Sequence, residues 1–182
     1  MHLPDGMTSE VLQAIMALRF EKHLPLSHIC EQHPNLVFYP NKKPWHIEAD
    51  IAMPCATENE ILVADIDTLF QGGVKVIVEG ANMPVQPQAI SRIVEKNITF
   101  APGKAANAGG VAVSGLEMSQ NAMRYYWTHE EVDEKLKSIM QTIHDKCYAF
   151  SSHKPNEAVQ YAKGANIVGF KKIADAMLAF GI

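Results

Sequence analysis

The spacing of apolar residues divides the middle of the chain into short strands and helices. Apolar runs at residues 49–53, 74–78 and 98–101 predict strands, and the β-branched run 74–78 is typical of a strand covered on both faces. Residues 58–70 and 86–96, which lie between these strands, are predicted to form helices. Because strands and helices alternate with short links, we expect parallel strands joined by right-handed crossovers. The fold class predicted is α/β, with a partial doubly wound, Rossmann-like parallel sheet.

Helical patterns also occupy both ends of the chain. Thr8 or Ser9 is a suitable N-cap for a helix that reaches about residue 23. Further on, a helix is expected from the Gly109–Gly110 pair to Trp127.

Two more helices are expected after that point. Thr128 and Glu131 have the spacing of a capping box at the start of one, and the other follows Asn166. We therefore divide the chain into residues 1–108, the partial Rossmann-like domain, and residues 109–182, a C-terminal helical segment that packs on it.

Composition narrows the classes of function. The chain has 182 residues, of which 47% are hydrophobic and 20% charged, as in ordinary globular proteins. Its net charge of -4 argues against nucleic acid or an anionic membrane as a partner. No apolar run approaches the roughly 20 residues of a membrane span. The three cysteines are odd in number and far apart, which favours a reducing, cytoplasmic location.

Three loops that follow the predicted strands are rich in small and polar residues: 54–60, 79–84 and 101–110. The loops at the carboxyl ends of parallel strands form the ligand crevice of an open α/β sheet. Small residues allow a flat ligand to approach the backbone, and amide side chains can bind a carboxamide or a ribose hydroxyl. Glycine and asparagine also occur in such loops simply as turn and cap residues.

Several other kinds of site find no support. The chain contains no G-x-G-x-x-G fingerprint of a dinucleotide-binding turn. His23, His28 and His33 recur every fifth residue around a proline-broken segment, which is a poor spacing for shared metal ligands, so no metal site is expected. Cys55 is expected to be a small buried side chain rather than a nucleophile.

The three loops also carry a family resemblance, together with residues 43–45, 111–121, 127–133 and 164–177. In order and spacing these segments resemble the hexameric bacterial-type glutamate dehydrogenases of the Glu/Leu/Phe/Val dehydrogenase family. The similarity covers nearly the whole chain and implies the C-terminal part of the NAD(P)-binding domain plus the C-terminal helices. Such an enzyme is an oxidoreductase of amino acid metabolism: it transfers hydride between glutamate and a nicotinamide, releasing 2-oxoglutarate and ammonium.

The resemblance implies specific contacts for five residues. Asn82 matches an asparagine that lies against the nicotinamide ribose, and Asn107 matches one beside the nicotinamide and the substrate. Ala56 and Thr57 match the loop beneath the cofactor. Ser114 matches a serine near a helix start that contacts a substrate carboxylate, a place where free backbone amides favour negative charge.

Each of these residues also has an ordinary structural interpretation. Ser114 and Glu117 fit the Ser-x-x-Glu pattern of a helix cap. Asn82, which precedes Met83 and Pro84, is equally suitable as a turn residue. Lys104 is given no role. The combination of motifs, rather than any single residue, favours the functional interpretation.

The resemblance also implies what this chain does not supply. In the family, the catalytic lysine and aspartate lie in a substrate domain that precedes this region, and the residue that separates NAD from NADP also lies upstream. We therefore expect no catalytic residue in this chain, no activity from the chain alone, and either NADP or NAD as the cofactor. Its expected partners are glutamate or 2-oxoglutarate, the cofactor, and an N-terminal half or a second copy. The alternative hypothesis is a non-catalytic ligand-binding or interaction module derived from the same domain.

Overall fold

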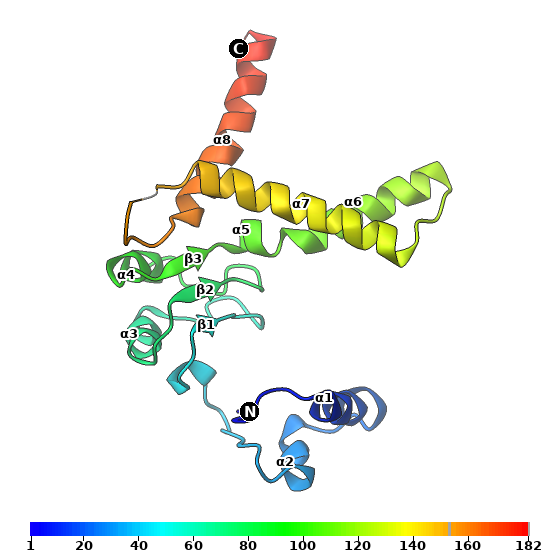
Figure 1. Ribbon diagram of the computed structural model, residues 1–182, viewed down its shortest axis with the longest axis vertical. Coiled ribbons are helices and arrows are strands. Elements are labelled where there is room, and N and C mark those ends of the chain that lie inside the picture. The colour runs from blue at the N-terminus through cyan, green and yellow to red at the C-terminus, as the bar shows by residue number, and fades with distance from the viewer. Residues whose placement is uncertain (153, 182) are drawn as a thin grey trace. The chain divides into compact units, whose positions relative to one another are not determined.

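The computed structural model describes residues 1–152 and 154–181, which form two compact units (Figure 1). The first unit is Met1–Ile47, and the second begins at Glu48. This division differs from the one predicted at residue 108, because the sheet and the C-terminal helices share contacts within the second unit.

The first unit is a small helical body. The Thr8 hydroxyl accepts a 3.2 Å hydrogen bond from the Val11 amide, which confirms the predicted N-cap. The helix is regular only over α1 (Ser9–Met16) and then widens into the π-helical turn η1 (Ala17–Glu21). Three short elements follow: η2 (Leu26–His28), α2 (Ile29–Gln32) and η3 (Pro44–His46). Leu18, Ile29 and Leu36 form the buried apolar cluster of this unit.

The second unit contains the predicted parallel sheet. In the described residues it has three strands, β1 (Ile51–Ala52), β2 (Val76–Val78) and β3 (Thr99–Ala101), in the order β1-β2-β3. Both pairings are parallel. The predicted α/β fold class, with a partial doubly wound sheet, is therefore confirmed, although each strand is shorter than its apolar run.

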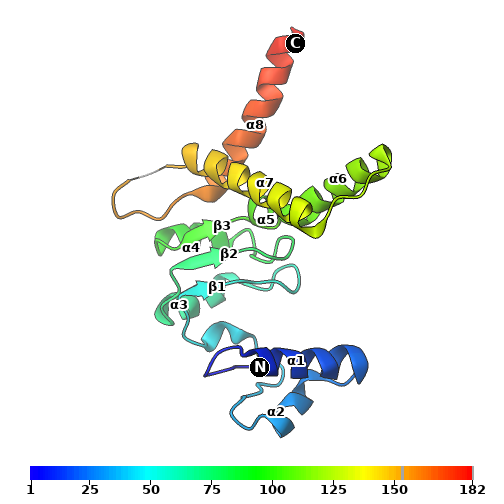
Figure 2. The same cartoon turned by 45° about the vertical axis from the view of Figure 1, so that its right-hand side comes forward.

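One face of the sheet is closed by helices. Ile77 pairs with Ala52 on one side and with Phe100 on the other, and the exposed fractions of these residues are 0%, 5% and 6%. Helices α3 (Val63–Gln71) and α4 (Ala89–Glu95) lie together on one side of the sheet in both views (Figures 1 and 2). Their buried side chains complete the core of the unit: Ile66, Leu69, Ala89 and Ile93.

The opposite face is only partly covered. Val76, Val78, Thr99 and Ala101 are half-buried and line a cavity of about 650 Å³ against helix α7 (His129–Ala149). Full coverage of β2 on both faces, expected from its sequence, is therefore wrong for the described part of the chain.

The C-terminal helices begin and end differently from the prediction in two places. The capping box of α7 is confirmed, because Glu131 donates its amide to the Thr128 hydroxyl and accepts the Thr128 amide through its carboxylate. However, α6 (Ala108–Met123) begins before the glycine pair and ends at Arg124, whose left-handed φ of 53° stops it. Helix α8 (Tyr161–Phe180) begins five residues before Asn166.

Helices α6 and α8 extend beyond the sheet (Figure 2). Both carry exposed apolar side chains. Val111 on α6 is 73% exposed and Phe170 on α8 is 74% exposed. Even so, none of the helices described is both long and apolar enough to cross a lipid bilayer.

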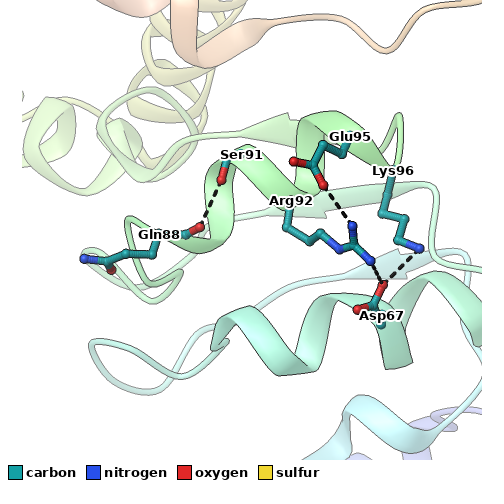
Figure 3. Close-up of polar contacts among 6 residues, drawn as sticks. All are labelled: Asp67, Gln88, Ser91, Arg92, Glu95 and Lys96. Atoms are coloured by element: carbon teal, nitrogen blue, oxygen red, sulfur yellow. Dashed lines mark hydrogen bonds and ion pairs between the residues drawn. The ribbon is translucent and has the colours of Figure 1, made fainter.

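A group of charged side chains joins α3 to α4 (Figure 3). The Asp67 carboxylate lies 2.8 Å from the Arg92 guanidinium and 2.9 Å from the Lys96 ammonium group, and Arg92 also pairs with Glu95 at 2.8 Å. Hydrogen bonds from Lys96 and then Arg92 lower the pKa of the Asp67 carboxyl below its ordinary value. These groups are partly exposed, so water and salt screen their attraction.

The lowered pKa predicts an acid-dependent contribution to stability. Because the folded-state pKa of Asp67 lies below its unfolded value of about 3.9, its contribution is complete above that value and is lost as the pH falls through the folded pKa. The Asp67→Asn variant should therefore be less stable than the natural chain at pH 6, and the difference should shrink below about pH 4. Denaturant unfolding at a series of pH values measures this difference in the free energy of unfolding. An equal difference at pH 3 and pH 6 would contradict a stabilising role for the ionised Asp67 carboxylate.

The crossing of α7 and α8 depends on a glycine. A Cβ atom at Gly164 would overlap the backbone carbonyl oxygen of Cys147 on α7, and backbone atoms cannot rotate away as a side chain can. The two helices can therefore approach this closely only because residue 164 has no side chain.

We predict that Gly164→Ala destabilises the chain by about 1–3 kcal/mol, the usual cost of overpacking a closed contact. The matched control is Gly169→Ala in the same helix, where an added Cβ meets nothing within 4 Å. That control should be neutral or stabilising by about 0.5–1 kcal/mol, because alanine favours helix more than glycine does. If the two substitutions change the free energy of unfolding equally in denaturant unfolding, the close approach of α7 and α8 does not depend on the missing side chain at residue 164.

Candidate functional site

The loops that follow the three strands meet at one edge of the sheet. The amides of Gly80 and Ala81 donate to the Pro54 carbonyl oxygen, at 3.0 and 3.1 Å, and so join the loop after β1 to the loop after β2. A third bond, from the Asn59 amide to the Met83 carbonyl oxygen at 3.1 Å, connects the same two loops further along. The predicted convergence of these loops is thus confirmed by direct backbone contacts.

Gly80 allows this close approach. A Cβ atom there would collide with the sulfur of Cys55. Cys55 itself is exposed, so the expectation that it is a buried side chain is wrong. Its side chain lies against the turn at the start of the second loop instead of entering the core.

Two predicted cofactor-binding residues lie in direct contact. The Asn107 side-chain amide donates to the Asn82 carboxamide oxygen at 2.8 Å and to the Ala81 carbonyl oxygen at 3.1 Å. The Ala81 carbonyl can only accept, so it determines which end of the Asn107 amide is the nitrogen. The pair is left with the Asn107 oxygen as an acceptor and the Asn82 nitrogen as a donor, a combination complementary to a carboxamide or a hydroxyl group.

Behind this pair lies a buried carboxylate, Glu79, at the end of β2. Its side chain is 7% exposed, and its two oxygens accept from the Val85 amide at 3.2 Å and from the Gly103 amide at 2.6 Å. Gly103 has little room for a side chain, because a Cβ atom would lie 3.1 Å from the Ala81 carbonyl oxygen and 3.3 Å from the Asn107 nitrogen. Glu79 was not predicted as a site residue. The available signal was a charged residue directly after a wholly apolar strand.

The amide pair borders a cavity of about 940 Å³ between these loops and the start of α8. Its polar lining also includes Lys104, Gln160, Lys163 and Asn166. The Lys104 ammonium group donates to the Asn166 side-chain oxygen and so links the third loop to α8. Lys104 and Asn166 had not been predicted as site residues, because nothing in the sequence places α8 beside the third loop.

The other cofactor-binding candidates lie on the first loop. Ala56 and Thr57 are exposed, and the Ala56 amide donates to the Glu60 carboxylate at 2.9 Å. Neither residue lines the cavity beside Asn82, so the structure brings together two of the four predicted cofactor contacts.

Ser114 does not lie where the sequence placed it. It is the seventh residue of α6, is exposed, and donates its hydroxyl to the Gly110 carbonyl oxygen at 3.3 Å. Interpretation as a helix cap is therefore wrong, since α6 begins at Ala108. Free backbone amides cannot favour a substrate carboxylate at Ser114 either, because such amides occur only in the first turn of a helix. Ser114 does not line the cavity that contains Asn82 and Asn107.

Other kinds of chemistry find little support in the described residues. Residues 1–152 and 154–181 contain no cluster of three or more histidine, cysteine or acidic side chains that could hold a metal ion. Burial raises the pKa of the Cys147 thiol, which belongs to α7 and lines the cavity at the half-covered face of the sheet. A raised pKa disfavours the reactive thiolate, so Cys147 is not a candidate nucleophile.

Comparisons with known proteins show which family the sequence resembles. The model of the Glutamate/Leucine/Phenylalanine/Valine dehydrogenase family matches residues 1–181. The NADP-specific glutamate dehydrogenase of Haemophilus influenzae is 45% identical over 179 residues, which cover 98% of this chain and 40% of that protein. The NAD-specific glutamate dehydrogenase of Porphyromonas gingivalis is 46% identical over 180 residues, with the same coverage.

A solved structure is also similar to this chain. The structure of glutamate dehydrogenase 2 from Plasmodium falciparum superposes on this chain with a TM-score of 0.88 and is 48% identical in sequence. The superposition covers 98% of this chain and 39% of the Plasmodium chain. The chain therefore spans about 40% of the length of the relatives that it matches.

Proposed function

The chain belongs to the Glutamate/Leucine/Phenylalanine/Valine dehydrogenase family, and from this premise we propose that it is the C-terminal portion of a glutamate dehydrogenase. In such an enzyme it supplies loops that contact the nicotinamide cofactor and the substrate. The reaction is the oxidative deamination of L-glutamate to 2-oxoglutarate and ammonium, with NAD or NADP as the hydride acceptor.

The observation that carries this proposal is the Asn82–Asn107 pair. Its free donor and acceptor face a cavity at the carboxyl edge of a parallel sheet, which is where α/β proteins bind nucleotides. A nicotinamide bears a carboxamide, and its ribose bears hydroxyl groups, so both kinds of polar group on the ligand can be matched. We assign the cofactor contacts to Asn82 and Asn107, with Ala56 and Thr57 in the adjoining loop.

Ser114 is the proposed substrate contact. Its hydroxyl is exposed on α6 and needs only to exchange its bond to the Gly110 carbonyl for a bond to a substrate carboxylate. The relatives are named as NADP-specific and as NAD-specific enzymes, so either cofactor remains compatible with the family.

We further propose that catalysis requires the rest of the enzyme. No acid-base pair is assigned to this chain, and proton transfer needs groups positioned against the bound substrate. The half-covered sheet face and the exposed apolar residues of α6 and α8 support a covering partner, because surfaces of this kind usually mark interfaces. That partner is an N-terminal half of the enzyme or a second copy of the chain.

This proposal predicts that the purified 182-residue chain does not catalyse 2-oxoglutarate-dependent oxidation of NADPH or NADH. A chimera of the Haemophilus influenzae enzyme, with this chain in place of the matching region, should recover that activity. Absorbance of the reduced nicotinamide measures both, with the unaltered Haemophilus enzyme as the reference. Activity in the chain alone would overturn the assignment of catalysis to another segment. A folded but inactive chimera, combined with cofactor binding by the chain alone, would favour the non-catalytic module.

Substitutions in the chimera should separate the substrate contact from the cofactor contacts. Ser114→Ala should raise KM for 2-oxoglutarate by about 10-fold or more, the loss expected for one hydrogen bond to a charged group, and leave KM for the cofactor unchanged. Asn82→Ala should do the reverse. The matched control is Ser119→Ala, whose hydroxyl donates to the Gly115 carbonyl oxygen at 2.9 Å on the same helix. Equal effects of the two serine substitutions would contradict a substrate contact at Ser114.

A further inference from the structure

Glu79 is the side chain that connects the ends of two loops in the candidate site. Its first oxygen binds the Val85 amide and so closes the loop of residues 79–85 on itself. Its second oxygen binds the Gly103 amide, at the start of α5 (Gly103–Ala106), 24 residues away in the chain. One carboxylate therefore holds together the segment that bears Asn82 and the segment that bears Asn107.

The bonds from Gly103 lead directly to the amide pair. The Gly103 carbonyl oxygen accepts from the Asn107 backbone amide at 2.9 Å, which places Asn107 one helical turn beyond the residue that Glu79 holds. The Asn107 side chain then turns back to Ala81 and Asn82. A shift of Gly103 away from Glu79 would move Asn107 by a similar amount and break its contact with Asn82.

The two oxygens of Glu79 are matched to this arrangement. Both partners are N–H donors, and each Glu79 oxygen accepts from one of them. None of the ion pairs formed by the described residues includes Glu79. A buried carboxylate without a cation is expensive unless backbone amides satisfy it, which makes the two bonds obligatory rather than incidental.

We propose that Glu79 is a positioning residue: by bridging the Val85 and Gly103 amides, it holds the Asn82–Asn107 pair in the geometry that receives the cofactor. This rests on the proposed function, because the cofactor contact of the pair is itself part of that proposal. Glu79 does not touch the ligand in this role. It acts through the two loops.

The test compares Glu79→Gln with Glu79→Asp. Glutamine has the same shape but turns one acceptor into a donor, which faces an N–H group and cannot bond to it. Aspartate keeps both acceptors but is shorter by one methylene, so it should retain one of the two bonds. The matched control is Glu131→Gln, which makes the same chemical change at a carboxylate that accepts the Thr128 amide at the start of α7.

The first measurement is NMR of the full 182-residue chain. In the Glu79→Gln variant, the amide hydrogen of Gly103 or Val85 should exchange at least about tenfold faster relative to that of Ile77 in the sheet, and the side-chain amide signal of Asn107 should shift. The Glu79→Asp variant should lie between this variant and the natural chain, and Glu131→Gln should leave these signals in place. If exchange and the Asn107 signal are unchanged in both Glu79 variants, the proposal is overturned.

The second measurement is steady-state kinetics in the chimera. Glu79→Gln should raise KM for the cofactor by about tenfold, with KM for 2-oxoglutarate unchanged, whereas general destabilisation would lower the amount of active enzyme and leave both KM values as they are. If the Asn107 signal shifts but KM for the cofactor does not, while Asn82→Ala still raises it, the positioning role is wrong and the proposed function stands. If Asn82→Ala also leaves KM for the cofactor unchanged, the proposed function fails first, and the positioning role with it.

Discussion

The parallel register of the sheet is the constraint on which the site depends. Ala52, Ile77 and Phe100 form one buried row across the three strands, so neither neighbour of β2 can slip by one residue without turning its buried side chain to the other face. With the register held, the three strands end together, and the loops that leave them must share one edge. The backbone bonds from Gly80 and Ala81 to Pro54 are possible only because of this alignment.

The small residues of these loops follow from how closely the loops pack. An added Cβ at Gly103 would press on the Ala81 carbonyl oxygen of the neighbouring loop, and one at Gly80 would displace the Cys55 side chain. Neither glycine has a positive φ, so close packing rather than backbone strain disfavours a side chain there. Close packing removes water from the loop amides, which must then find acceptors within the protein. Glu79 provides two such acceptors from one side chain. The buried charge and the glycines are therefore two consequences of the same close approach.

The sequence predicted the parts of the fold that depend on local pattern. The Thr8 cap, the Thr128–Glu131 capping box and the parallel pairing of the strands were all recoverable, because each depends on residues near one another in the chain or on short links. The resemblance predicted Asn82 and Asn107, and their direct contact supports a shared role. The burial of Glu79 and the approach of α8 to Lys104 could not be predicted, since both depend on contacts between distant segments. Ser114 was misplaced because its capping pattern, Ser-x-x-Glu, also occurs by chance within a helix.

The proposed cofactor and substrate contacts differ in what holds them in place. Asn82 and Asn107 are fixed by bonds among loops on the sheet, so their geometry is preorganised within the second unit. Ser114 lies on α6, which extends beyond the sheet and exposes Val111 and Met118, so its position depends on whatever covers that helix. A partner that buries α6 would therefore align the substrate contact with a cofactor site that is already formed. Under the proposed function, binding of a partner would therefore position Ser114, whereas the contact between Asn82 and Asn107 is already formed within the second unit.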